Sequence, residues 1–95
     1  MKKPVPGLRF WRFTQVMGKD HRLRSGYRLH YVRAVVDDQI VTRRWCARHG
    51  WHYALVSVFA WELEGRGRLP IVFTQREAFL RNAKLIVERK KAAHP

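Results

Sequence analysis

Three runs of strand-forming residues between Tyr27 and Leu63, separated by two short turn signals, constrain the fold more than any other feature. The runs are YRLHYVRAVV, QIVTRRWCAR and WHYALVSVFAWEL, each rich in valine, isoleucine or aromatic residues. The breaks are Asp37-Asp38 and His49-Gly50. Both suit two-residue hairpin loops, because aspartate and glycine tolerate the left-handed backbone region. The segment therefore predicts a three-stranded antiparallel meander.

If both loops hold two residues, the register assigns the meander side chains to two faces of different character. The first, a valine–alanine face, includes His30, Val32, Val41, Arg43, Trp45, Ala54, Val56 and Val58. The second, a ring–arginine face, includes Tyr27, Tyr31, Arg33, Ile40, Thr42, Arg44, Cys46, Arg48, Trp51, Tyr53 and Leu55. We expect the valine–alanine face to be the core and the ring–arginine face to be the functional surface. An error of one residue in either turn would exchange the faces.

The charge of the chain is strongly positive and narrows the range of partners. Twenty lysines and arginines stand against seven aspartates and glutamates, which gives a net charge of +13 and a pI of about 11.3. Such a chain attracts polyanions, so nucleic acid, an acidic protein surface and an anionic membrane are candidate partners. Most of the excess is arginine, whose planar fork binds phosphate through two hydrogen bonds and stacks on bases. This composition favours nucleic acid.

A length of 95 residues allows one domain. We expect it to span residues 1–95, with a loose arm at 1–7 and a frayed end at 91–95. The single cysteine, Cys46, excludes an internal disulfide and fits a reducing compartment. Charged residues interrupt every apolar run, so we expect neither a signal peptide nor a membrane helix. The expected location is the cytoplasm, or the host cytosol if a phage encodes the protein.

The segment before the meander extends the predicted sheet. Leu8–Met17, LRFWRFTQVM, reads most simply as a further strand at the edge of the meander, and Gly18–Gly26 as a basic loop between the two. Two alternatives remain open. The segment could form a short helix, because its apolar spacing is ambiguous. It could also fold across the ring–arginine face and bury the rings.

The segment after the meander predicts a helix. Thr74–Glu77 is a capping box, in which the threonine hydroxyl accepts from a backbone N–H of the first turn. The helix should continue to about Lys90 and cover the valine–alanine face with an apolar stripe of Phe79, Ala83, Ile86 and Val87, with Leu80 beside it. The predicted fold class is α+β: an antiparallel sheet of three to four strands (meander 27–63) with one C-terminal helix packed on one face.

Several residues of the meander are types that bind zinc. They are Cys46, His49 and His52, and His30 or His21 would supply a fourth ligand. The cluster straddles a tight turn, and the predicted register places Cys46 and His52 on opposite faces. We therefore expect no metal and no other cofactor.

Catalytic signatures are sparse. A nuclease-like pair would need Glu62 or Glu64 beside His52 or His30. No glycine-rich phosphate loop, Ser-His-acid set or HExxH motif is present in the sequence. We expect the protein not to be an enzyme.

Two stretches resemble a known family of small DNA readers, the AP2 and phage-integrase arm type. HGWHYALV (49–56) is similar to the tight turn and tryptophan-containing strand of that family, and FTQREA (73–78) to its strand-to-helix junction. The resemblance covers residues 27–90 in topology and implies DNA binding by a three-stranded sheet. The chain also resembles, in size and arginine content, phage accessory proteins such as anti-CRISPR inhibitors. That likeness implies a host nucleoprotein complex as partner.

The sequence therefore predicts a binding protein, with two hypotheses for its partner. In the first, the sheet binds nucleic acid, either by stacking single-stranded bases on rings or by reading a duplex groove with arginine. In the second, the same surface of an inhibitor or adaptor binds an acidic protein or a nucleoprotein complex. The expected contact residues are Arg22, Arg24, Arg33, Arg44, Arg48, Arg66, Arg68, Tyr31, Trp51 and Tyr53.

Overall fold

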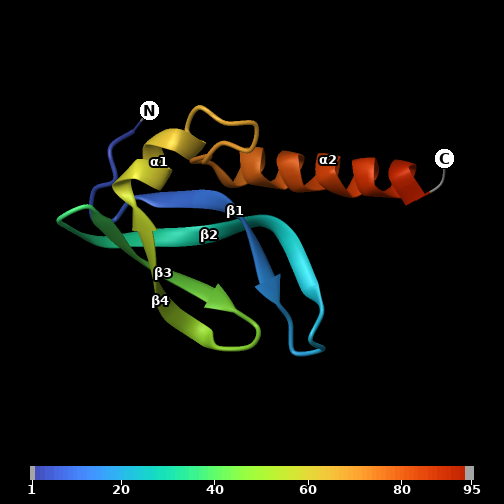
Figure 1. The fold of residues 1–95 in the computed structure, drawn as a ribbon, viewed down its shortest axis with the longest axis horizontal. Coiled ribbons are helices and arrows are strands. Elements are labelled where there is room, and N and C mark those ends of the chain that lie inside the picture. Colours follow the sequence, from blue (N-terminus) through green and yellow to red (C-terminus); the bar gives the residue numbers. More distant parts are fainter. Residues whose placement is uncertain (1, 94–95) are drawn as a thin grey trace.

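A four-stranded antiparallel sheet and two helices make up the protein in the computed structural model, which describes residues 2–93 (Figure 1). In chain order the elements are β1 (Arg9–Met17), β2 (Leu23–Val36), β3 (Gln39–Cys46), β4 (Gly50–Ser57), α1 (Val58–Glu64) and α2 (Gln75–Ala93). The strands lie in the order β1-β2-β3-β4. This confirms the predicted α+β class, with the segment Leu8–Met17 supplying the fourth strand beside the meander.

The β1–β2 hairpin is longer than predicted. β1 pairs with β2 from Arg9↔Tyr31 to Met17↔Leu23, so only residues 18–22 form the connecting loop. The predicted loop, Gly18–Gly26, is wrong at its second half, because residues 23–26 belong to β2. Residues 23–26, Leu-Arg-Ser-Gly, are strand in the structure, but their charged and small side chains give no strand pattern in the sequence.

The register between β2 and β3 contains a β-bulge that the sequence does not predict. The two-residue loop at Asp37-Asp38 is present, because Val36 pairs with Gln39, and Asp37 has a φ of 55°. The register then shifts by one residue between Val32 and Ala34. A bulge adds one unpaired residue to one strand and so moves every later pair. The side chains of β3 therefore face the opposite way from the prediction relative to most of β2.

The loop between β3 and β4 is one residue longer than predicted. Cys46 pairs with Gly50, which leaves a three-residue loop at 47–49 in place of the expected His49-Gly50 turn. Gly50 has a φ of 65°, the left-handed conformation that a glycine accepts without a Cβ clash. The register of β3 with β4 thus also differs from the prediction by an odd number of residues. The two differences cancel for β4, which faces the predicted way relative to β2. Only β3 is therefore exchanged: Ile40, Thr42, Arg44 and Cys46 face inward with Val32, Ala54 and Val56, while Val41, Arg43 and Trp45 face outward.

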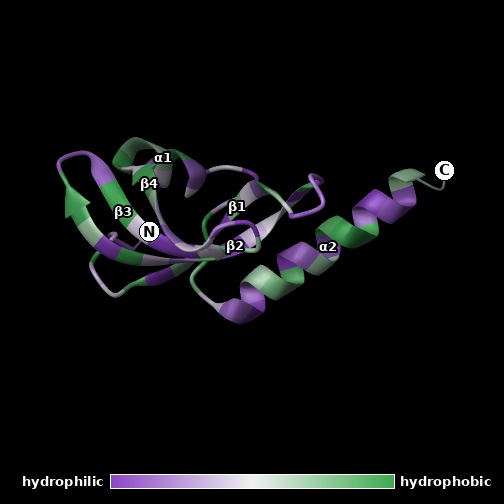
Figure 2. Cartoon of the chain, turned by 90° about the horizontal axis from the view of Figure 1, so that it is seen from below, coloured by the Kyte–Doolittle hydropathy of each residue, from purple (hydrophilic) through white to green (hydrophobic). Residues whose placement is uncertain are grey.

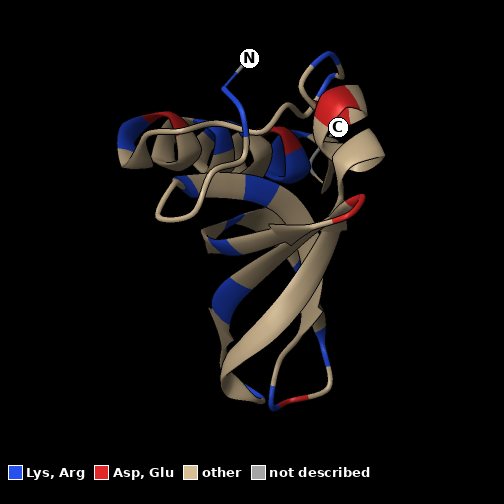
Figure 3. Cartoon of the chain, turned by 90° about the vertical axis from the view of Figure 1, so that its left-hand side faces the viewer, with Lys and Arg blue, Asp and Glu red and all other residues tan. Residues whose placement is uncertain are grey.

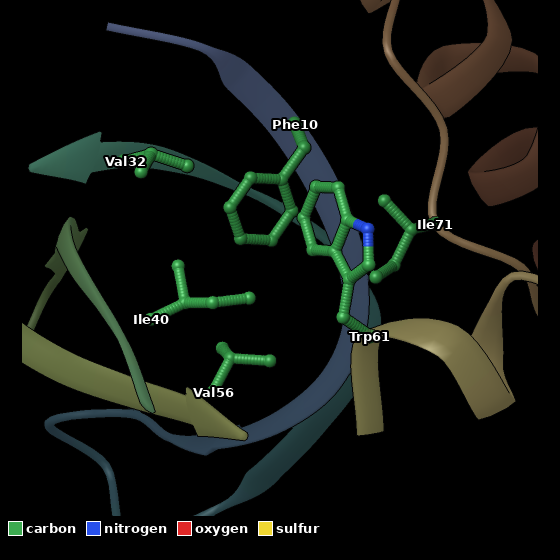
Figure 4. Packing of buried hydrophobic residues seen from close by; sticks show 6 residues of the cluster. All are labelled: Phe10, Val32, Ile40, Val56, Trp61 and Ile71. Carbon is green, nitrogen blue, oxygen red and sulfur yellow. The ribbon is translucent and has the colours of Figure 1, made fainter. Parts of the chain in front are cut away.

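The hydrophobic core lies on this inner face of the sheet. It contains Phe10, Val32, Ile40, Val56, Trp61 and Ile71, all at most 5% exposed (Figure 4). Trp61 comes from α1, which closes the core at one end and meets the Phe10 ring edge-on, with 4.9 Å between the ring centroids. Burying one such large apolar side chain contributes about 1.5–3 kcal/mol.

Helix α1 replaces the end of the third predicted strand. The sequence predicts strand to Leu63, yet β4 ends at Ser57 and the next seven residues are helical. The Ser57 hydroxyl accepts a hydrogen bond from the backbone N–H of Ala60 at 3.0 Å, an N-cap that ends the strand and starts the helix. A run of strand-forming residues therefore becomes helical where a cap and the burial of Trp61 both favour it.

Helix α2 packs on the outer face of β1 and β2, not on the valine–alanine face as predicted. Its buried residue Ala78 joins a second cluster with Trp11, Tyr27 and Val72, bordered by Phe13 and Leu29. The cause lies just before the helix. Val72 pairs with Trp11 through two backbone hydrogen bonds of 2.8 and 3.1 Å, so this segment runs along the free edge of β1. From that edge the chain delivers α2 to the outer face.

A side-chain amide joins α2 to β2. Asn82 accepts from the Tyr27 N–H at 2.7 Å and donates to the Tyr27 carbonyl at 3.3 Å. The β2–β3 pairing ends at His30↔Arg44, so the N–H and C=O groups of Tyr27 have no partner in β3. The Asn82 side chain supplies the missing hydrogen bonds. Gly26 permits this approach, since a Cβ there would lie 3.1 Å from the Asn82 amide oxygen.

The apolar stripe predicted for the core is exposed on α2. Phe79, Leu80, Ile86 and Val87 are each at least half exposed, and the helix extends well past the sheet (Figures 1 and 2). The Thr74 hydroxyl accepts from the Glu77 N–H at 3.2 Å, as the capping box predicts. The helix runs to Ala93, past the predicted end at Lys90 and into the predicted frayed segment, of which residues 94–95 lie outside the described part.

The N-terminal arm has no regular secondary structure in residues 2–7, and both of its ends are held. The indole N–H of Trp61 donates to the Lys2 carbonyl at 3.0 Å, and the Gly7 N–H donates to the Val32 carbonyl at 2.9 Å. Neither α1 nor α2 has both the length and the apolar character needed to cross a membrane.

Candidate nucleic-acid interface

A row of alternating arginines and tyrosines crosses the outer face of all four strands. The pairs Arg9↔Tyr31, Tyr31↔Arg43 and Arg43↔Tyr53 join β1 to β2, β2 to β3 and β3 to β4. Directly paired residues in an antiparallel sheet share a face, with Cβ atoms about 4.5–5.5 Å apart. The four side chains therefore form one continuous line perpendicular to the strands.

Trp51 adds a third ring beside this row. Its ring centroid lies 5.9 Å from that of Tyr31, and the Arg43 guanidinium lies 5.8 Å from the Trp51 ring and 5.9 Å from the Tyr53 ring. Each such cation–π contact contributes about 0.5–1 kcal/mol at an exposed site. Tyr31, Arg33, Arg43 and Trp51 line an open hollow of about 270 Å³. The rings and the Arg43 guanidinium thus contact one another directly.

These rings are exposed to an unusual extent. Tyr53 is 64% exposed, Trp45 55% and Trp51 50%. Trp45 pairs with Trp51 and so lies on the same face. We call this surface the outer patch, defined by Arg9, Tyr31, Arg33, Arg43, Trp45, Trp51 and Tyr53. Large flat rings exposed in a group are typical of binding surfaces.

The outer patch is free of internal ion pairs. The two ion pairs within residues 2–93 join Arg12 to Glu64 at 2.8 Å and Arg24 to Asp20 at 2.7 Å, and both lie elsewhere. The Arg24 guanidinium lowers the pKa of Asp20 by hydrogen bonding to its carboxylate. The strands carry no acidic residue, and the acidic positions lie on the helices and in the loops (Figure 3). The guanidinium groups of the patch can therefore bind external anions.

The structure brings together four of the predicted contact residues. Tyr31, Arg33 and Trp51 line the hollow, and Tyr53 lies beside them. The alternative in which Leu8–Met17 buries these rings is wrong, because that segment pairs edge to edge with β2. Tyr27 is the exception: it is 5% exposed beneath α2, where burial raises its pKa.

The remaining predicted contacts are dispersed. Arg44 lies on the inner face, and Arg48 lies in the loop at 47–49, with a guanidinium nitrogen 3.5 Å from the Met17 sulfur. The others lie in or beside loops: Arg22 in the β1–β2 loop, Arg24 just after it in β2, and Arg66 and Arg68 in the connection from α1 to α2. These residues form no single surface with the outer patch.

Sequence reasoning missed three members of the patch: Arg9, Arg43 and Trp45. The predicted register places Arg43 and Trp45 on the core side of the sheet, and this is the error in β3. The sequence Thr42-Arg43-Arg44-Trp45 has polar residues at both alternating sets of positions, so it does not indicate which set faces the core. Leu8–Met17 is predicted as a strand, but its register with β2 is not. The pair Arg9↔Tyr31, which places Arg9 on the outer face, therefore does not follow from the sequence.

The structure brings two of the candidate zinc ligands together and places Glu64, a candidate nuclease residue, beside Arg12. Cys46 and His52 share a face, contrary to the prediction, with 3.9 Å between the sulfur and the ring nitrogen Nδ1. Across residues 2–93 no third histidine, cysteine or acidic residue joins them as a possible metal ligand. The Glu64 carboxylate binds the Arg12 guanidinium through two nitrogens, so it does not pair with His52.

Comparisons with family models, with curated proteins and with solved structures found no match to this chain.

Proposed function

We propose that this protein binds single-stranded nucleic acid, DNA or RNA, on the outer patch. The observation that carries the proposal is the row Arg9–Tyr31–Arg43–Tyr53 with Trp51 beside it. Tyr31 is half-buried, the other four side chains are exposed, and the arginines have no counter-ion among the described residues. Proteins that hold single strands combine cations that bind the backbone with rings on which bases stack. The outer patch supplies both on one surface.

The rings favour a single strand over a duplex. In a duplex the flat faces of the bases already stack on one another, so a ring on the protein surface has no base face to cover. In a single strand the base faces are available. Stacking is worth about 1–3 kcal/mol per base. Exposed Trp51 and Tyr53 therefore gain most from an unpaired strand.

The arginines would hold the sugar–phosphate backbone. Arg9, Arg33 and Arg43 lie beside the rings, and a guanidinium can bind a phosphate through two parallel hydrogen bonds. The proposed role is binding without catalysis or a cofactor. The proposed location is the cytosol, which is the host cytosol for a phage-encoded chain.

Equilibrium binding to fluorescent oligonucleotides of mixed sequence tests the proposal. We expect the protein to bind single-stranded DNA or RNA more tightly than a duplex of the same length. Trp51→Ala should weaken single-strand binding about five- to a hundredfold, the equivalent of one lost stacked base. Arg43→Met should weaken it as well, since it removes both a phosphate contact and the cation between the rings.

Arg66→Met is the matched control. It removes the same charge from an exposed position near α1, outside the outer patch. We expect a loss of twofold or less. Equal losses for Arg43→Met and Arg66→Met would indicate diffuse charge attraction and would refute binding on the patch.

A second candidate function has its own observation. The stripe Phe79, Leu80, Ile86 and Val87 is exposed on α2, and exposed apolar stripes on helices often bind a partner protein. This favours an inhibitor or adaptor that binds a host protein or nucleoprotein complex. Tight binding to a purified protein, lost in Phe79→Ser, together with negligible affinity for free oligonucleotides, would favour this function over the first.

A further inference from the structure

The inner face of the sheet carries a second group of cations, separate from the outer patch. Arg28 and Arg44 lie there beside His30, past the end of the core. We propose that Arg28 and Arg44 form a binding site for a tetrahedral oxyanion, a phosphate group. The site lies on the opposite side of the sheet from the outer patch and does not depend on the function proposed for that patch.

The local geometry places the two arginines together. His30 pairs with Arg44, and this is the last pair before β2 and β3 separate. Arg28 lies two residues before His30 and therefore on the same face. The loop at 47–49 reaches the far end of β1, where the Arg48 guanidinium meets the Met17 sulfur at 3.5 Å. The tip of the β3–β4 hairpin therefore lies beside the end of the β1–β2 hairpin.

Both arginines are half-buried with incomplete hydrogen bonding. Within the described chain, three buried side-chain nitrogens lack a hydrogen-bond partner: Arg28 Nε, His30 Nε2 and Arg44 Nε. All three belong to this one patch of the inner face. His30 Nδ1 donates to the Thr42 hydroxyl, which itself donates to the Ala54 carbonyl, so the neutral ring leaves Nε2 as an acceptor. The unpaired donors are therefore Arg28 Nε and Arg44 Nε. Buried donors are normally paired, and two unpaired ones at a single place point to a missing acceptor.

The charges lead to the same conclusion. Burial lowers the pKa of Arg28, and the nearby Arg44 and Arg24 lower it further. The neighbouring Arg12 already binds Glu64, and Arg24 binds Asp20, so each has its own carboxylate. Arg28 and Arg44 have no such partner among residues 2–93. Two guanidinium groups held close together without a counter-ion repel each other, and a bound phosphate would remove that repulsion.

Thermal unfolding with inorganic phosphate as the probe tests the site. Phosphate is titrated against chloride at constant ionic strength. We expect the melting temperature of the unmodified protein to rise saturably, by about 5 °C or more when phosphate exceeds its Kd tenfold. Arg44→Met should abolish the rise. Its melting temperature without phosphate should equal or exceed that of the unmodified protein, because the repulsion is gone.

Matched variants make the result specific. Arg66→Met removes an exposed arginine outside both the outer patch and the inner-face site and should keep the full phosphate response. Arg28→Met provides a second test if Arg44→Met does not fold, and should also lose the response. No saturable rise in the unmodified protein, or an unchanged response in Arg28→Met, would overturn the proposal.

Two sources of phosphate are separated by oligonucleotide binding. If the ligand is a nucleic-acid backbone, Arg44→Met weakens oligonucleotide binding and inorganic phosphate competes with the strand. If the ligand is a free phosphate or a phosphomonoester, Arg44→Met leaves oligonucleotide binding unchanged while the phosphate response is still lost. Either result supports the site. A loss of oligonucleotide binding in Trp51→Ala with the phosphate response intact would show that the two sites are independent.

Discussion

Arg43 and Arg44 are neighbours in the chain but face opposite sides of the sheet and differ in their surroundings. Arg43 is exposed between the rings of Trp51 and Tyr53, whereas Arg44 is half-buried beside His30. An exposed guanidinium can exchange water for phosphate at little cost. A half-buried one without a partner destabilises the folded state until an anion binds. One residue of register therefore decides which arginine belongs to which surface.

His30 should govern the stability of the protein in acid. It is 1% exposed, and burial, together with the charges of Arg44 and Arg12, lowers its pKa from 6.5 to about 3. Between these two pH values the unfolded chain binds a proton that the folded chain does not. The free energy of unfolding therefore falls as the pH falls, by up to about 1.4 kcal/mol per pH unit. This contribution is fully present above about pH 6.5 and is lost on acidification towards pH 3.

Urea unfolding between pH 7 and pH 4.5 measures this effect. We expect His30→Gln, which cannot titrate, to flatten the dependence of the free energy of unfolding on pH. His49→Gln, in the exposed loop at 47–49, should keep the dependence of the unmodified protein. Identical pH dependence in the unmodified protein and in His30→Gln would show that another group is responsible.

At the scale of the elements, the sequence predicts the strands better than their faces. Runs rich in valine and aromatic residues identify β2, β3 and β4, and the apolar pattern of Leu8–Met17 identifies β1. The face of β3 is wrong because the register depends on a bulge near Arg33 and on the length of the loop before Gly50. Val35 pairs with Ile40 in both the predicted and the observed register. The shift after that pair brings Thr42 opposite Val32, on the face of the core, and local sequence does not specify it.

Helix α2 shows the same limit in another form. The spacing of its apolar residues correctly predicts an apolar stripe, and Thr74 correctly predicts where the helix begins. The buried side instead carries Ala78 and Asn82, because Asn82 satisfies the Tyr27 backbone where β3 no longer pairs with β2. A pattern of apolar residues cannot indicate that a polar residue such as Asn82 lies on the buried side to bind a backbone group. The stripe is consequently left exposed.

The N-cap of α1 is predicted to determine where β4 ends. Ser57→Ala removes the hydroxyl that accepts from the Ala60 N–H, so we expect the free energy of unfolding to fall by about 1 kcal/mol. Ser57→Asp keeps an acceptor at the cap and should retain most of the stability. Urea unfolding at pH 7 measures both. A loss in Ser57→Asp as large as that in Ser57→Ala would show that the cap is not the cause.

The whole molecule presents three surfaces of different chemistry. The outer patch combines rings with arginine, the inner face holds Arg28 and Arg44, and α2 exposes an apolar stripe. The sequence alone finds Tyr31, Trp51 and Tyr53 of the outer patch, because β2 and β4 face as predicted. It does not find Arg43, and it cannot separate Arg44 from the patch, because both depend on the register of β3.

The net charge of +13 gives the whole chain an attraction for any polyanion. Affinity by itself therefore does not show where a strand binds. The proposed function specifies a location, because we propose that bases stack on the rings of the outer patch. A measurement that identifies the contacted side chains tests it most directly.

That measurement is photocrosslinking of the full chain to a single-stranded oligonucleotide carrying photoreactive bases, with the attached residues identified by mass spectrometry. We predict crosslinks at Tyr31, Trp51 or Tyr53, and their loss on competition with unmodified single strand but not with duplex. Crosslinks confined to α2 or to the connection at 65–74, with none on these three rings, would contradict the account.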